Sequence, residues 1–572
     1  MALVVIATLA EVFTLGAVLP FLGVLVAPER VLHQPKIGAL TAHLGIVTAD
    51  QLILPMTLLF ATMAVITGVI RITLLWATTR LAYATGSDLS LDVYRRTLYQ
   101  PYAVQVSRNS SDVISGIVNK VGETVYCLSQ VLLLISSVFL LIVITLALLL
   151  IDPTVAAIAI AGFGSAYGTL SLTHRRQLRR NSVRIAAEGT QVVKALQEGL
   201  GGIRDVLLDG TQSVYCGIYS RADGALRRAQ GDNIFVSGNP RFAMEALGMV
   251  LIAALAYGLS RRTGGMATAL PVLGTLALGA QRVLPALQQA YAAWAFIAGA
   301  YGSVSATVAL LSQPLPAEAS EPPPPPLRFR DSICFDRVSF RYRSDGPWVL
   351  NDLSLLIPKG SRVGIVGSTG SGKSTALDLL MGLLVPTAGE LLVDNEPVTG
   401  GRVRAWQRSI AHVPQNIYLA DASIAENIAF GVPMESIDMD RVKLAAQQAQ
   451  IAEFISSQPE GYDVAVGERG IRLSGGQRQR IGIARALYKK ASVLVFDEAT
   501  SALDSVTERS VMDAIEGLNP DLTILLIAHR LSTVQHCGTI IELQAGRLVA
   551  QGTYQQLLEI SPTFRGMASA VS

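Results

Sequence analysis

The chain has 572 residues, of which 51% are hydrophobic and only 16% are charged. A soluble protein carries charged side chains at about a quarter of its positions, so we expect part of this chain to lie in a membrane. A formal net charge of +3, without a cluster of basic and aromatic residues, gives no indication of a nucleic-acid partner, and we expect none. The four cysteines lack the spacing of a metal site and fit reduced thiols in a protein that faces the cytoplasm.

The apolar excess lies in residues 1–311, where six segments are long enough to cross a membrane, which takes about 20 mostly apolar residues. The first exceeds the apolar core of a signal peptide, contains Glu11 and has no basic residues before it, so we interpret it as a retained membrane helix. Because it starts abruptly, we expect a short cytoplasmic lead-in helix to be missing from this chain. The expected spans are residues 2–27, 52–79, 131–151, 154–172, 242–260 and 266–286, the last continuing as helix towards residue 311.

The connections between these spans alternate in length and charge. Residues 80–120 carry four arginines and a lysine, and residues 174–241 carry ten arginines. By contrast, the third and fourth spans are joined by residues 152–153, and the last two spans by residues 261–265. By the positive-inside rule the two long basic connections lie in the cytoplasm. Each contains a stretch without proline that is rich in helix formers, so we expect the membrane helices to continue into the cytoplasm and to turn near residues 101–110 and 209–211.

Residues 312–326 contain seven prolines, five of them consecutive. This composition predicts a semi-rigid spacer between a membrane domain, residues 1–311, and a soluble domain, residues 327–572. A ligand for SH3-type domains is an alternative reading of the same composition.

A glycine-rich turn, residues 367–374, lies between a buried-type strand at 362–366 and an apolar-periodic helix at 375–384. This context is that of a phosphate-binding loop, in which successive backbone N–H groups surround phosphates at a helix N-terminus. Lys373 is expected to reach the β- and γ-phosphates of ATP, and the Ser374 hydroxyl to bind Mg²⁺.

A second buried strand, residues 493–496, ends in Asp497 and Glu498. Asp497 is placed to hold Mg²⁺ directly or through water, and Glu498 to polarise the attacking water. The two carboxylates therefore predict a site that is competent for ATP hydrolysis.

The pentapeptide LSGGQ at residues 473–477 precedes this strand. With the phosphate loop and Asp497 it makes the chain resemble the ATP-binding-cassette (ABC) ATPases. We expect Ser474 and the amides of Gly475 and Gly476 to cap a helix at residues 477–487, and a helix N-terminus is a favourable site for an anion. The resemblance implies that this helix end closes on the γ-phosphate held by a partner subunit.

The resemblance also implies roles for single residues. Gln415 matches the Q-loop glutamine, His529 the switch histidine that contacts the γ-phosphate, and Tyr342 the aromatic residue that stacks on adenine. Taken alone, a strand tyrosine is more often a packing residue. The inferred nucleotide-binding residues are Tyr342, Gly367, Ser368, Thr369, Gly370, Ser371, Gly372, Lys373, Ser374, Thr375, Leu473, Ser474, Gly475, Gly476, Gln477 and Asp504, with Glu498, His529 and Gln415 as catalytic residues and Ser374, Gln415 and Asp497 as Mg²⁺ ligands.

The order of the two halves is similar to that of ABC exporters, in which the membrane domain precedes the ATPase, and residues 466–470 resemble the exporter X-loop. The expected fold class is thus a membrane α-helical domain with six transmembrane helices, as in type I exporters, followed by an α/β P-loop ATPase domain. One cassette is half a transporter, so a partner is required. A homodimer is the economical expectation because no motif is degenerate, and a heterodimer stays open. We expect a bacterial inner-membrane protein with its ATPase in the cytoplasm.

Residues 11–21 are similar to a segment of the lipid-linked oligosaccharide flippases and their bacterial relatives, which implies an amphipathic glycolipid or lipid-linked saccharide as the transported substrate. Ionisable residues in membrane spans are candidate substrate contacts, here Glu11, Arg71, Glu245 and Arg282. The alternative is that Arg71 and Arg282 lie near the cytoplasmic ends of their spans and extend to the interface. An exporter of peptides or hydrophobic drugs stays open, and a soluble ABC ATPase is a distant alternative.

Overall fold

The computed structural model describes residues 2–26, 51, 53–151, 153–260, 283–498, 505–516, 521–527 and 531–569. It divides into two compact units, Met1–Gln100 with Arg108–Leu315, and Pro101–Ser107 with Pro316–Ser572. The short helix α5 (Tyr102–Ser107) therefore groups with the second unit, which the division drawn from the sequence does not include.

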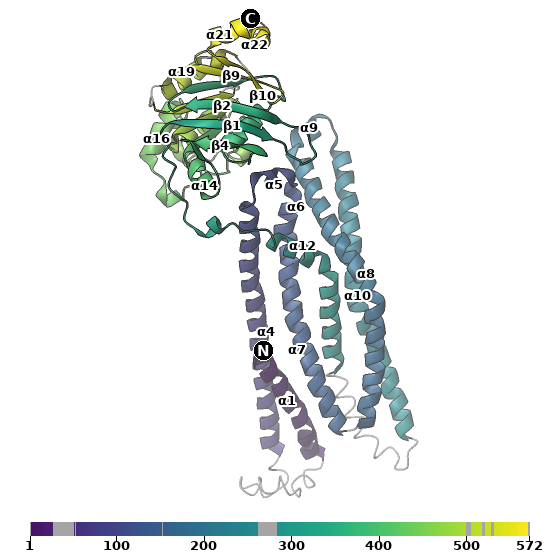
Figure 1. Cartoon of the computed structure of the whole chain (residues 1–572). Helices are drawn as coiled ribbons and strands as arrows, with labels where there is room; N and C mark the ends of the chain where they lie inside the picture. The colour runs from purple at the N-terminus through teal and green to yellow at the C-terminus, as the bar shows by residue number, and fades with distance from the viewer. Residues whose placement is uncertain are drawn as a thin grey trace. The chain divides into compact units, whose positions relative to one another are not determined.

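The first unit is a bundle of long helices (Figure 1). Helices α4, α8 and α10 contain 46, 49 and 49 residues. At a rise of 1.5 Å per residue each is roughly 70 Å long, more than twice the ~30 Å of a hydrocarbon core, which is the length that cytoplasmic extensions require. The helices are α1 (Ala2–Val26), α4 (Ile53–Leu98), α6 (Ser110–Ser115), the π-helical η2 (Gly116–Lys120), α7 (Val121–Ile151), α8 (Pro153–Gly201), α9 (Ile203–Leu208), α10 (Gln212–Ser260), Val283–Gly299 and α12 (Tyr301–Leu311).

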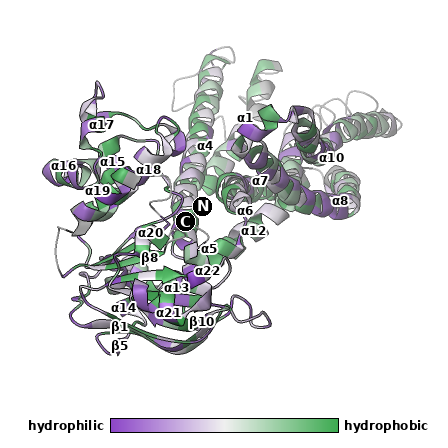
Figure 2. Cartoon of the chain, turned by 90° about the horizontal axis from the view of Figure 1, so that it is seen from above, coloured by the Kyte–Doolittle hydropathy of each residue, from purple (hydrophilic) through white to green (hydrophobic). Residues whose placement is uncertain are grey.

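Two described helical stretches, Ile53–Leu98 and Ser110–Leu146, are long and apolar enough to cross a membrane, and the bent pair Val283–Gly299 and Tyr301–Leu311 is a third if it counts as one span. The predicted spans at 2–27, 154–172 and 242–260 fall on α1, α8 and α10. Most of the sixth predicted span lies outside the described residues, so the number six stays a prediction. Much of the visible part of α8 carries the hydrophilic colour in Figure 2, in agreement with its arginine-rich sequence.

A proline inside α10 shows how three helices of this bundle are joined. Pro240 has no N–H to donate to the carbonyl of Val236, one helical turn earlier. The hydroxyl of Tyr291, on the helix Val283–Gly299, donates to this carbonyl at 3.4 Å, and Nδ1 of His174 on α8 lies 3.0 Å from the same hydroxyl. The backbone group that the proline leaves without a partner is thus satisfied from a neighbouring helix.

The second unit contains two sheets. Strand order in the six-stranded sheet is β10-β9-β3-β8-β7-β6, parallel except for β10, and in the antiparallel four-stranded sheet it is β2-β1-β4-β5. The strands are β1 (Ser332–Phe340), β2 (Leu350–Pro358), β3 (Arg362–Val366), β4 (Ala388–Val393), β5 (Glu396–Pro397), β6 (Ile410–Val413), β7 (Val493–Asp497), β8 (Thr523–Ile527), β9 (Thr539–Gln544) and β10 (Arg547–Gly552).

The central parallel strands β3, β7 and β8 are buried on both faces, as expected for parallel strands covered by other elements. Along β7, Val493 and Val495 enter one hydrophobic cluster, and Leu494 and Phe496 enter the other. The helices of this unit, apart from α5, are α13 (Lys373–Leu380), α14 (Gly401–Arg408), α15 (Ile424–Ile428), α16 (Met439–Gln448), α17 (Ala452–Ser456), α18 (Gly475–Tyr488), α19 (Ser505–Glu516), α20 (Leu531–Val534), α21 (Tyr554–Ile560) and α22 (Pro562–Ser569).

The proline-rich segment lies against α14. The Nη1 atom of Arg408 donates to the carbonyls of Pro323 at 3.2 Å and Pro324 at 2.9 Å, and Nη1 of Arg404 donates to the carbonyl of Glu318 at 2.6 Å. The predicted spacer is therefore attached along part of its length to the unit that follows it.

Candidate functional site

The predicted phosphate loop joins the end of β3 to the start of α13. Helix α13 begins at Lys373 and ends at Leu380, two residues earlier and four residues shorter at its C-terminus than we expect from the sequence, because the loop itself closes into the first turn. Gly372 has a φ of +100°, and a Cβ added there would lie 2.7 Å from Cδ2 of Leu350. Only glycine fits this position without displacing the strand beside it.

Lys373 supplies the positive charge of the loop. Its Nζ donates to the carbonyls of Gly367 at 2.8 Å and Ser368 at 3.0 Å. Burial lowers the pKa of this ammonium group, and the negative charges of Glu498 and Asp497 act in the opposite direction. Among the described residues, the hydrogen-bond partners of this ammonium group are backbone carbonyls. It can therefore turn towards an incoming phosphate, which is a stronger acceptor.

Two side chains that the sequence places far apart meet at the ends of β6 and β7. These strands are parallel neighbours, with Val413 opposite Phe496. The residues that follow them therefore emerge at the same edge of the sheet, and Nε2 of Gln415 donates to Oε2 of Glu498 at 2.6 Å. Glu498 has a φ of +51°, an uncommon conformation for a residue with a side chain. The side-chain amide of Gln415 thus fixes the orientation of the Glu498 carboxylate. A carboxylate that positions a water molecule needs such a fixed orientation.

Tyr342 follows β1 and lies beside the N-terminal half of α13. Its ring packs edge-on against Phe340 at a centroid distance of 5.0 Å, and its hydroxyl lies 3.2 Å from Oγ1 of Thr375. The ring is 58% exposed, so one face is open to a planar ligand.

Asp378 is a residue of this region that the motifs do not indicate. It lies on α13, and burial together with the negative charge of Asp497 raises its pKa to about 6. Tyr102 on α5 has a raised pKa through burial and then through the charges of Asp378 and Tyr342. The sequence carries no local signal for this cluster, because it depends on where α5 and α13 lie in the second unit.

The LSGGQ segment forms the N-terminus of α18. The helix begins at Gly475, two residues earlier than expected, and ends at Tyr488. Ser474 is its N-cap: the Ser474 hydroxyl accepts from the N–H of Gln477 at 3.2 Å, and Oε1 of Gln477 accepts from the N–H of Ser474 at 2.8 Å. This capping box explains the early start, and the remaining amides of the first turn are available to an anion. His529, Asp504 and Arg282 lie outside the described residues.

Two of the cavities in the helical unit contain an arginine that is paired with a glutamate. A cavity of about 560 Å³ includes Glu11 on α1 and Arg71 on α4, whose Oε1 and Nη1 atoms are 3.2 Å apart. The Glu11 side chain is 9% exposed and that of Arg71 is 50% exposed, so the arginine retains an open side. We call this space the α4–α7 cavity.

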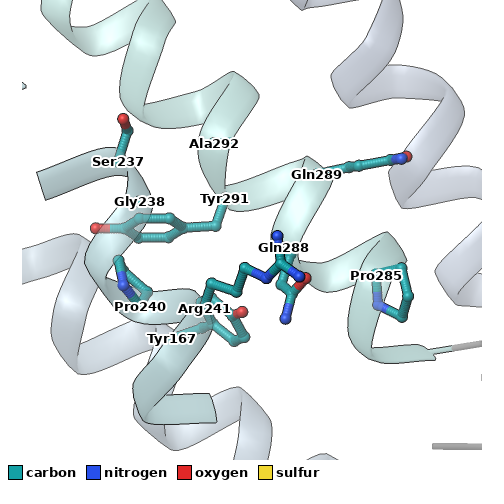
Figure 3. A pocket seen from close by; sticks show the side chains of 10 residues that line it. All are labelled: Tyr167, Ser237, Gly238, Pro240, Arg241, Pro285, Gln288, Gln289, Tyr291 and Ala292. Atoms are coloured by element: carbon teal, nitrogen blue, oxygen red, sulfur yellow. The ribbon is translucent and has the colours of Figure 1, made fainter. Parts of the chain in front are cut away.

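A second cavity, of about 330 Å³, is lined by Arg241, Gln288 and Tyr167 (Figure 3). Glu245 accepts from Nε of Arg241 at 3.0 Å and from Nε2 of Gln288 at 3.4 Å. Gln289 lines both cavities. The sequence pattern does not indicate Arg241, because this residue precedes the predicted start of its span by one position.

A glycine loop at a helix N-terminus, a nearby pair of carboxylates and a bundle of long apolar helices together define a P-loop ATPase fused to a membrane domain. The family model described as ABC transporter matches residues 350–501. The chain is 31% identical over 490 residues to an ATP-dependent lipid A-core flippase of Cupriavidus metallidurans, with 84% of this chain and 80% of that protein covered. It is 34% identical over 406 residues to an ATP-dependent lipid A-core flippase of Alkalilimnicola ehrlichii, with 70% and 67% covered.

The chain therefore belongs to the ABC transporter family. The solved structure of a bacterial Atm1-family ABC exporter with ATP bound matches it with a TM-score of 0.79 and 26% identity, over 100% of this chain and 98% of that chain. This likeness confirms the predicted fold class of an N-terminal helical domain followed by an ABC ATPase, and it confirms the prediction of an ATP-driven translocase of the exporter type.

Proposed function

We propose that two copies of this chain form an exporter that uses ATP hydrolysis to move an anionic glycolipid out of the cytoplasmic leaflet of a bacterial inner membrane. The observation that carries the substrate proposal is the half-exposed guanidinium of Arg71 in a cavity of the apolar bundle. The names of the relatives, which are lipid A-core flippases, support the same class of substrate.

In the proposed nucleotide site, the backbone of residues 367–372 and the Lys373 ammonium group hold the phosphates of ATP, with Ser374 and Thr375 beside them. Tyr342 stacks on adenine, and Glu498, oriented by Gln415, polarises the attacking water. His529 contacts the γ-phosphate, and Asp504 of the D-loop crosses to the partner. These two roles are carried over from the family resemblance.

The donors at this site fit Mg²⁺. Ser374, Gln415 and Asp497 offer a hydroxyl, an amide oxygen and a carboxylate, and a magnesium site in a nucleotide-binding protein uses one or two carboxylates completed by phosphate oxygens and water. Ser371 supports the fit of a phosphate-bound ion, since its hydroxyl is buried in the loop without a hydrogen-bond partner among the described residues. When bound, the ion neutralises charge on the β- and γ-phosphates.

The proposal of a dimer rests on two anion-binding groups of the chain, the phosphate loop and the N-terminus of α18. In the proposed head-to-tail sandwich, the capped end of α18 from one copy faces the phosphate loop of the other. A homodimer is also consistent with α9, whose Leu207 and Leu208 side chains are 59% and 75% exposed within this chain.

Mixing two inactive variants tests the sandwich. A Lys373→Ala chain and a Ser474→Arg chain each form homodimers in which both sites are defective. In a mixed dimer one site receives both substitutions and the other receives neither. Random pairing makes half of the dimers mixed, so about a quarter of the wild-type ATPase rate should return when the chains are co-expressed. If each site lay within one chain, mixing would restore nothing.

The substrate proposal is tested by ATPase stimulation in proteoliposomes. A phosphorylated glycolipid should stimulate the wild-type enzyme, and Arg71→Ala should raise the half-maximal concentration at least tenfold, because a hydrogen bond between charged groups contributes about 1.5–3 kcal/mol. Arg80→Ala, on the same helix at an exposed position, is the matched control and should behave as wild type. Stimulation by hydrophobic peptides or drugs, with no response to the glycolipid, would favour the alternative exporter.

A further inference from the structure

One face of α7 carries polar side chains into the α4–α7 cavity. Ser129, Gln130, Ser136 and Ser137 all line it, and their spacing of i, i+1, i+7 and i+8 places them on one side of the helix. Ser137 is about 21 Å from the end of α7 at Ile151, counted at 1.5 Å per residue. This lies within the ~30 Å of a hydrocarbon core, where water cannot satisfy a polar group.

The hydroxyl of Ser137 points to an absent ligand. The residue is 2% exposed, and its Oγ has no hydrogen-bond partner among the described residues. By contrast, the hydroxyls of Thr57, Thr62, Thr73 and Thr78 on α4 donate to a carbonyl of their own helix. A buried hydroxyl that lacks this bond is costly unless a ligand completes it.

The rest of the lining narrows the chemistry of that ligand. Tyr83 and Tyr126 are 59% and 45% exposed and line the same cavity, and the Tyr126 ring packs edge-on against Phe296. Glu11 and Arg71 form an ion pair, and the open side of Arg71 is the part of this lining that suits an anionic group. Hydroxyl and amide groups beside exposed aromatic faces suit a polyhydroxyl compound, whose O–H groups both donate and accept while its C–H faces pack on rings. The volume of about 560 Å³ falls in the range of small-molecule sites, about 300–1,000 Å³.

We infer that the α4–α7 cavity binds the saccharide part of the transported lipid, with sugar hydroxyls on Gln130, Ser136 and Ser137 and a sugar ring on Tyr126. This inference rests on the proposed function for the presence of a sugar, and it assigns that sugar to side chains other than Arg71 in the same cavity. Substitutions on α7 should then weaken binding of the sugar, and substitution of Arg71 should weaken binding of the anionic group.

Three lipid probes in nanodiscs separate them through ATPase stimulation: a phosphorylated acylated disaccharide, a neutral diglucosyl diacylglycerol, and phosphatidic acid. Ser137→Ala and Gln130→Leu should raise the half-maximal concentration of both sugar lipids about three- to tenfold, the loss expected for a hydrogen bond between neutral groups. The same variants should leave the response to phosphatidic acid as in wild type. Arg71→Ala should weaken the two phosphorylated probes and spare the neutral glycolipid.

Ser165→Ala on α8 is the matched control. Its hydroxyl already donates to the carbonyl of Gly162 at 3.1 Å and is exposed, so removing it should leave all three responses unchanged. Ser137→Ala should also raise the apparent melting temperature of the substrate-free protein, because it removes an unsatisfied buried hydroxyl. A hydroxyl with a structural role would show the opposite sign.

The neutral glycolipid decides the inference by itself. No stimulation by this probe, or stimulation that Ser137→Ala leaves unchanged, overturns it, as does a fall in melting temperature in that variant. Absence of a response to phosphatidic acid, with a Ser137-dependent response to the neutral glycolipid, supports the saccharide site and instead contradicts the anionic part of the proposed function.

Discussion

Replacing Asp378 by asparagine should stabilise the nucleotide-free protein at neutral and alkaline pH. The carboxyl group lies on α13, half-buried beside Asp497, and its pKa is raised from 3.8 to about 6. A raised pKa means that the folded state favours the protonated group. The stability that this group contributes is therefore fully present below the unfolded pKa near 3.8 and is lost as the pH rises through 6.

The shift of about 2 units corresponds to about 3 kcal/mol at 1.36 kcal/mol per unit. Because the group is only half-buried, solvent screening reduces this, and we expect about 1–1.5 kcal/mol. In a domain of about 250 residues, 1 kcal/mol moves the melting temperature by about 2–4 °C. Asp378→Asn should thus melt about 2–6 °C above wild type at pH 8, and the difference should shrink to about half at pH 5 and disappear only below about pH 4, where the carboxyl group is protonated in both the folded and the unfolded state.

The measurement is the unfolding midpoint of both proteins, free of nucleotide, across about pH 4–8, which covers the interval between the two pKa values. The exposed Asp421 provides the control, and Asp421→Asn should change little at any pH. Asp497→Asn should itself reduce the gain from Asp378→Asn, since it removes the neighbouring charge. A difference that is constant with pH, or a less stable Asp378→Asn protein at pH 8, would refute the reasoning.

Three further outcomes are expected. Glu498→Gln should reduce phosphate release at least about 100-fold while ATP binding persists, as judged by nucleotide retention, because the amide cannot act as a base. Gly372→Ala should abolish ATP binding, since its Cβ would lie 2.7 Å from Leu350 at a φ of +100°; Gly401→Ala, with open space around it, should bind ATP normally. Ser474→Ala should lower the free energy of unfolding by about 1 kcal/mol in denaturant titrations, because the α18 cap is lost.

The parts of the fold that local sequence determines were predictable. The strand at 362–366 coincides with β3, because an apolar run followed by a glycine turn specifies both its burial and its end. The sequence predicts the start of α18 at Gln477, two residues later than the structure has it. In the structure Gln477 is the third residue of the helix, and it completes the capping box with Ser474.

Contacts that depend on strand order or on distant segments were not derivable from the residues alone. The hydrogen bond between Gln415 and Glu498 requires β6 and β7 to be neighbours, and no spacing in the sequence gives that order. The raised pKa of Asp378 depends likewise on the position of Asp497 at the end of β7. The family resemblance supplied the residue types of the site, whereas their geometry came from the sheet.

The proline content of residues 312–326 predicts a stiff segment, but it does not predict where that segment lies against the rest of the chain. Prolines cannot donate, so each carbonyl along such a run lacks the partner that regular structure would supply. Arg404 and Arg408 on α14 donate to three of these carbonyls. At the other end of the segment, Arg96 donates to the carbonyl of Gln313, and Gln100 to that of Pro314. Only a few residues separate these two sets of hydrogen bonds, so most of the predicted spacer is attached to one or the other unit.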